Sequence, residues 1–65
     1  MLKTELAKYP LEIEIVDALV VFMIYHGIET VAELASTNDE TLKSMDGYEP
    51  YFLEAVHVIR GTQLN

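Results

Sequence analysis

Apolar residues along this chain recur at the three- and four-residue spacing that is typical of helices. Leu2, Leu6 and Tyr9 share one helical face, which predicts a short helix over residues 2–9 that ends at the following proline. Residues 11–15 alternate apolar and acidic side chains as a strand does, but they have no second strand to pair with. We therefore interpret residues 11–15 as the entry into the next helix.

The strongest helical pattern spans residues 14–26. On a helical wheel, five apolar side chains share one face and form the expected core side of this helix: Val16, Leu19, Val20, Met23 and Ile24. The opposite face is also apolar and carries Ala18, Val21, Phe22 and Tyr25. Gly27 is expected to end the helix, because glycine commonly occupies the C-terminal cap.

Two short helices are predicted next by a repeated capping-box pattern, in which a threonine precedes a glutamate by three residues. Thr30 and Glu33 form the first box, and Thr37 and Glu40 form the second. Acidic side chains in both first turns suit the positive end of the helix dipole.

The last predicted helix follows the Asp46-Gly47 turn and accepts Pro50 in its first turn. Its expected core face consists of Phe52, Ala55, Val56 and Ile59. Gly61 is expected to end this helix and to leave residues 61–65 as a frayed tail.

These five helices, two long and three short, predict an all-α fold. We expect a single domain over residues 1–65, with its main body at residues 11–60. The segments that begin at Gly27 and Gly47 repeat one pattern, in which a glycine, an apolar residue and a glutamate lead into a helix. This pseudo-repeat predicts two packed helix-hairpin-helix units, with these two glycines in the hairpin turns.

Composition excludes several classes of function. The 65 residues carry 11 acidic and 4 basic side chains, for a net charge of −7, and no cysteine. Disulfides and thiolate metal sites are therefore excluded. The negative charge disfavours a nucleic-acid backbone and an anionic membrane surface. No apolar run approaches the ~20 residues that span a bilayer, and with no export signal we expect a cytoplasmic location.

Residues with catalytic chemistry are sparse. His26 and His57 are the only histidines, and Ser36 and Ser44 have no adjacent base. The carboxylates are dispersed along the chain rather than paired. We therefore predict that the protein is not an enzyme and binds no metal or cofactor.

Several short motifs follow one another along residues 11–60. They are Leu11-Glu12-Ile13, the stretch Gly-Ile-Glu-Thr-Val-Ala-Glu-Leu-Ala at residues 27–35, Glu40-x-Leu42, Met45-Asp46-Gly47 and Glu49-Pro50. Together they resemble the acidic repeats at the C-terminus of the bacterial transcription elongation factor NusA. The C-terminal domain of the RNA polymerase α subunit has the same double helix-hairpin-helix arrangement. One departure is the pair Tyr25 and His26, where the NusA repeats usually have polar or acidic residues.

The resemblance implies an acidic protein–protein interaction module in bacterial or phage transcription. The implied partner is the RNA polymerase α C-terminal domain or a basic regulatory protein. The candidate protein-binding residues are Val21, Phe22, Tyr25, Glu29, Glu33, Tyr48 and Glu49. The glutamates would supply negative charge, and the aromatic residues would supply apolar anchors. Two interpretations of the chain are compatible with the resemblance. It is either a domain of a longer factor or a small free-standing protein that a phage or plasmid encodes.

The apolar back of helix 14–26 leaves three alternatives for what covers it: the N-terminal helix, a second copy of the chain, or another protein. A homodimer through this face is therefore an alternative function. A degenerate nucleic-acid-binding domain is a further one. It is disfavoured because Glu29 and Glu49 follow the hairpin glycines, and neither hairpin carries Lys or Arg.

Overall fold

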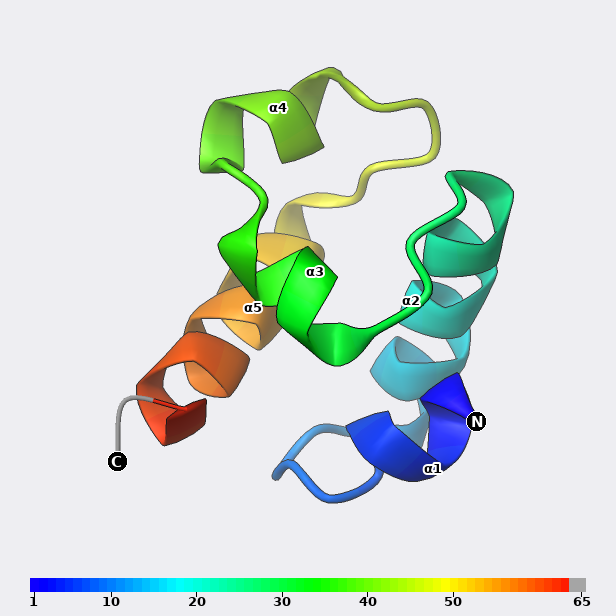
Figure 1. Ribbon diagram of the computed structural model, residues 1–65, viewed down its shortest axis with the longest axis vertical. Helices are drawn as coiled ribbons and strands as arrows, with labels where there is room; N and C mark the ends of the chain where they lie inside the picture. Colours follow the sequence, from blue (N-terminus) through cyan, green and yellow to red (C-terminus); the bar gives the residue numbers. More distant parts are fainter. Residues whose placement is uncertain (64–65) are drawn as a thin grey trace.

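A computed structural model describes residues 1–63, and these residues form five helices and no strand (Figure 1). The helices are α1 (Leu2–Leu6), α2 (Ile13–Tyr25), α3 (Val31–Ser36), α4 (Asp39–Ser44) and α5 (Pro50–Gln63). The predicted all-α fold is confirmed.

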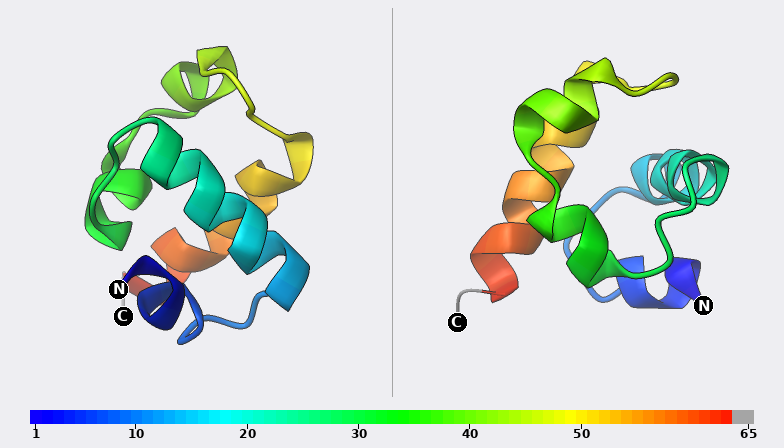
Figure 2. Two further views of the ribbon diagram at one scale, coloured as in Figure 1. Left: turned by 90° about the vertical axis from the view of Figure 1, so that its right-hand side faces the viewer. Right: turned by 45° about the horizontal axis from the view of Figure 1, so that its top comes forward.

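The two long helices, α2 and α5, pack against each other, and α3 packs on α5. Helix α1 contacts both α2 and α3. Figures 1 and 2 show α1 and α4 at opposite ends of the molecule. In the described part of the chain, the closely packed pairs do not include α2 with α3 or α4 with α5. The arrangement in two hairpin units therefore stays a prediction.

All five helices contribute to one hydrophobic core. Its buried members are Leu6, Val16, Leu19, Phe22, Met23, Ile28, Val31, Leu34, Leu42, Phe52, Ala55, Val56 and Ile59. The predicted core face of the last helix is therefore confirmed. Because α1 contributes the fully buried Leu6, this short helix is an integral part of the packing.

The buried face of α2 is rotated from the predicted one. Three of the five predicted core residues are buried: Val16, Leu19 and Met23. Val20 is only half-buried, and the prediction for Ile24 is wrong, because its side chain is 67% exposed. Phe22, which was predicted to lie on the opposite face, is only 4% exposed. The rotation follows from the position of α5 and of the segment before it, which pack on the Phe22 side of α2.

The predicted caps of α3 and α4 have different outcomes. The Thr30 hydroxyl accepts a hydrogen bond from the Glu33 amide at 3.1 Å, which confirms Thr30 as the first cap. The second cap is Asn38, whose side chain accepts from the Glu40 amide at 2.8 Å, so the prediction for Thr37 is wrong. Asparagine is the stronger N-cap, and the Thr37 hydroxyl instead donates to the preceding helix.

Helix α1 is shorter than predicted because it ends at Leu6 rather than at residue 9. The amide of Tyr9 still donates to the Leu6 carbonyl at 3.1 Å, as in a turn. A residue before proline is disfavoured in the helical region, which explains why the helix does not continue to Pro10.

The three glycines differ in backbone conformation. Gly27 and Gly47 have φ angles of +70° and +86°, so both occupy the left-handed region that favours glycine. Gly61 lies inside α5, which continues to Gln63. The prediction that Gly61 ends this helix is therefore wrong, and so is the frayed tail for residues 61–63. Residues 64 and 65 lie outside the described residues.

We expect alanine substitutions at Gly27 and Gly61 to change stability in opposite directions. An added Cβ meets no atom of the described residues within 4 Å at either position, so backbone conformation decides the result. Gly27→Ala should lower the free energy of unfolding by about 1–2 kcal/mol, because an L-residue is strained at positive φ. Gly61→Ala should raise it by up to about 1 kcal/mol, because alanine favours the helix. Urea denaturation of both variants measures the difference, and changes of the same sign would contradict these two conformations.

Candidate protein-binding groove

An apolar groove lies between the C-terminal half of α2 and the segment that leads into α5. Its volume is about 480 Å³. Helix α2 contributes Ala18, Val21, Phe22 and Tyr25, and the segment and α5 contribute Asp46, Gly47, Glu49, Tyr51 and Phe52. Phe22 and Phe52 are buried and also line the groove, so they form its base.

A cluster of three aromatic rings holds the two walls of the groove together. The ring centroids of Phe22 and Phe52 are 5.2 Å apart, and the two rings are tilted by 52°. The Tyr48 ring packs edge-on against both, with centroid distances of 6.4 Å to Phe22 and 6.0 Å to Phe52. Tilted and edge-on pairs at these distances are favourable beyond the area that they bury.

His26 fixes the segment before α5 to the end of α2. Its Nε2 atom lies 2.6 Å from the Asp46 carbonyl oxygen. A carbonyl oxygen only accepts hydrogen bonds, so Nε2 carries the proton and donates. The imidazole also packs against Phe22 and Tyr25, with centroid distances of 4.7 and 4.9 Å. Gly47 comes directly after Asp46 in the chain. A Cβ added at Gly47 would lie 3.8 Å from the Phe22 ring, so this segment passes close to the ring.

The groove brings together several of the candidate protein-binding residues. Val21, Tyr25 and Glu49 line it with exposed side chains, and Val21 and Tyr25 are 68% and 73% exposed. Phe22 also lines the groove, but its expected place on the outer side of α2 is wrong, because this side chain is buried in the core. Tyr48 is half-buried, and its buried hydroxyl group has no hydrogen-bond partner among the residues that the structure describes, so its ring belongs to the edge of the core.

The other candidates lie away from the groove. Glu29 lines a separate depression that it shares with Met1 and Leu2. Glu33 is exposed on α3, where its backbone takes part in helix capping. The groove therefore does not include these two glutamates.

Helix α1 does not cover the groove, because none of its residues lines it. It packs instead against another side of α2, where Lys3 forms an ion pair with Asp17 at 3.2 Å. The alternative that the N-terminal helix covers this apolar surface is therefore wrong.

Tyr51 extends the apolar surface beyond the groove. Its side chain is 43% exposed and also lines two adjoining depressions. One of them is lined by Glu14 and Ile15, and the other by Pro10, Leu11, Glu12, Ile15, Glu54, Ala55 and Val58. We call the groove and these two depressions the α2–α5 face.

Every charged side chain that lines the α2–α5 face is acidic. These residues are Glu12, Glu14, Asp46, Glu49 and Glu54, all exposed and without an ion pair in the described part of the chain. Three basic side chains elsewhere are paired, because Lys3, Lys8 and Arg60 contact Asp17, Glu5 and Asp39. The apolar face thus has an uncompensated negative rim, which the sequence did not reveal because its members come from three segments.

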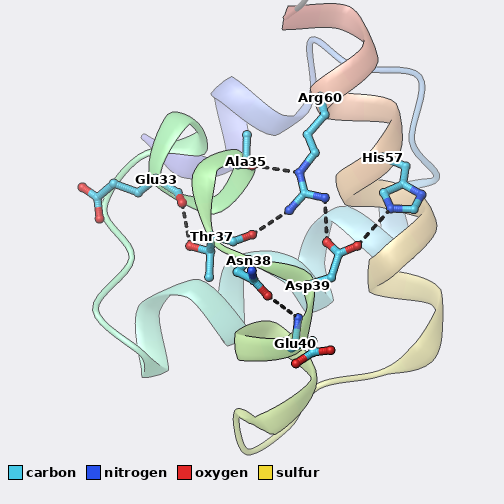
Figure 3. A network of polar contacts seen from close by, with 8 residues as sticks. All are labelled: Glu33, Ala35, Thr37, Asn38, Asp39, Glu40, His57 and Arg60. Atoms are coloured by element: carbon cyan, nitrogen blue, oxygen red, sulfur yellow. Dashed lines mark hydrogen bonds and ion pairs between the residues drawn. The ribbon is translucent and has the colours of Figure 1, made fainter.

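A second polar cluster surrounds Arg60 on α5 (Figure 3). Its Nε donates to the Ala35 carbonyl at 2.8 Å, and its Nη2 donates to the Thr37 carbonyl at 2.6 Å. Its Nη1 contacts Asp39 at 2.6 Å, and His57 Nε2 lies 3.4 Å from the same carboxylate. The hydrogen bond from Arg60 is the main cause that lowers the pKa of Asp39 below its ordinary value. This cluster joins α5 to the α3–α4 connection.

Neither the α2–α5 face nor the polar cluster around Arg60 has the composition of a metal site. Within residues 1–63, no group of three or more His, Asp or Glu side chains is placed to hold a metal ion. None of the described helices is long and apolar enough to cross a membrane.

No family model, curated protein or solved structure matches this chain.

We expect Arg60→Lys to lower the free energy of unfolding by about 1–3 kcal/mol. A lysine keeps the charge but lacks the planar fork that contacts two carbonyls and a carboxylate together, so hydrogen bonds to a charged group are lost. Thermal or urea unfolding of the variant measures this effect.

Lys43→Arg is the matched control for this prediction, because it exchanges the same two residue types at an exposed position. It should leave stability within about 0.5 kcal/mol of the starting protein. Equal stability of Arg60→Lys and the unmodified chain would show that the guanidinium contacts contribute nothing to the free energy of unfolding.

The contact between Asp39 and Arg60 also makes stability depend on pH. Its contribution to the free energy of unfolding is fully present above the ordinary Asp39 pKa of 3.8, and it is lost as the pH falls through the lowered pKa.

Proposed function

We propose that this chain is an acidic protein–protein interaction module and that the α2–α5 face is its docking surface. The observation that carries the proposal is the exposure of Val21 and Tyr25 beside an apolar groove. A contiguous apolar surface with a polar rim is typical of a binding site on a small protein. Burying such side chains on a partner contributes about 25 cal/mol for each Å² of apolar area.

We place this role in bacterial or phage transcription, in the cytoplasm. The support is the resemblance of residues 11–60 to the NusA acidic repeats and the net charge of −7. The partner to test is the RNA polymerase α C-terminal domain or a basic regulatory protein. Contact with nucleic acid is disfavoured, because Glu29 and Glu49 are both exposed and would oppose a phosphate backbone.

We infer that the protein is not an enzyme. The Arg60 guanidinium, the Asp39 carboxylate and the His57 ring are engaged with one another and with the α3–α4 connection. The contacts among these three side chains are therefore explained by the packing of α5 against the α3–α4 connection.

A homodimer is the second candidate function, because Val21 and Tyr25 are exposed and would be buried by a second copy. Phe22 adds little to this predicted interface, because it is already buried within one chain and lines only the base of the groove. Sedimentation of the pure protein at high concentration decides this point, since a strictly monomeric species removes the homodimer.

Titration of the ¹⁵N-labelled protein with the purified RNA polymerase α C-terminal domain tests the docking role. We expect amide signals of the groove residues Ala18, Val21, Tyr25 and Tyr51 to shift, because a bound partner changes their surroundings. Signals of Glu29 and Glu33 should stay unchanged as internal controls. Shifts confined to α3 and α4 would contradict the α2–α5 face as the docking surface, and no shifts at high concentration would exclude this partner.

A further inference from the structure

We propose that the groove takes a basic amphipathic helix from the partner protein. This proposal rests on the docking role above and adds the chemistry of the occupant. The apolar side of the incoming helix would lie against Val21, Tyr25 and Tyr51, and its lysine and arginine side chains would face the acidic rim.

The dimensions of the apolar surface fit a helix. Along α2 the groove extends from Ala18 to Tyr25, which spans two helical turns or about 10 Å. A helix placed alongside presents apolar residues at positions i, i+3 or i+4, and i+7 over the same length. Peptide binding by strand addition needs a sheet edge, and the residues that the structure describes contain no strand.

The charge of the rim selects a basic occupant. Asp46 and Glu49 line the groove itself, while Glu14 and Glu54 adjoin it across Tyr51. None of these acids has an ion pair within residues 1–63, so a cationic side chain can approach them without breaking an existing contact. Complementary charge around an apolar centre raises the association rate and selects among partners.

A second copy of this chain fits the same surface less well. It would bring the same acidic rim and a further net charge of −7 to the interface. Like charges placed opposite each other across an interface are unfavourable. Charge complementarity therefore favours a basic partner over self-association.

Two synthetic helical peptides of the same length test this inference by calorimetry and by ¹⁵N amide shifts. Both carry leucine at positions i, i+4 and i+7, and one has lysine where the other has glutamate. We expect the lysine peptide to bind at the groove with a Kd at least about tenfold lower than the glutamate peptide. The difference should shrink as the salt concentration rises from about 50 to about 300 mM, because the shorter Debye length screens the rim charges.

A pair of charge-reversal variants separates recognition at the groove from attraction to net charge. Glu49→Lys should weaken binding of the lysine peptide about two- to fivefold. Glu29→Lys makes the same change at an exposed position outside the α2–α5 face and should leave the Kd within about twofold.

Each other outcome overturns the inference. Equal affinity for the two peptides, or equal weakening by the two variants, would show that the acidic rim does not select the ligand. Self-association lost on substitution of Tyr25 would make a second copy the occupant. If neither peptide binds while the polymerase domain still shifts the groove signals, the basic helix is wrong and the docking role stands. If neither the peptides nor the domain shifts these signals, the basic helix is wrong and the docking role fails for this partner.

Discussion

The burial of Phe22 between α2 and α5 is the interaction on which the rest of the structure depends. Its ring packs against Phe52, Tyr48 and His26, and this packing sets the rotation of α2 about its axis. Because Phe22 points inward, the neighbouring Val21 and the Tyr25 ring remain outside the core. The groove is therefore a direct consequence of how the core is packed.

Much of the fold follows from local sequence signals. Helical spacing, proline, Gly27 and Gly47 place the five helices of the described residues within a few residues of their observed bounds. The rotation of α2 could not be predicted in this way, because that helix is apolar on nearly all sides. Its buried face is decided by which elements pack against it, and that information lies in other parts of the chain. The continuation of α5 through Gly61 is a similar case, since a glycine inside a helix costs only about 1 kcal/mol and does not by itself end it.

The polar features are less visible in the sequence because their partners are distant along the chain. Arg60 contacts Ala35, Thr37 and Asp39, which precede it by 21 to 25 positions. Two of these contacts are to backbone carbonyls, which carry no residue-specific signal. The acidic rim likewise joins the start of α2, the segment before α5 and α5 itself. Val21 and Tyr25 were nevertheless candidates from sequence, because apolar residues are unusual on the outer face of a helix. Glu49 was a candidate because of its negative charge.

The proposed docking surface is the α2–α5 face, rather than exposed apolar surface in general. Val21 and Ile24 test this most directly, because both lie on α2 and are 68% and 67% exposed, but only Val21 lines the groove. The measurement is the Kd of the lysine peptide for Val21→Ser and Ile24→Ser. We expect at least about fivefold weaker binding for Val21→Ser, from lost apolar contact, and no change beyond about twofold for Ile24→Ser. Equal effects of the two substitutions would contradict the α2–α5 face as the docking surface.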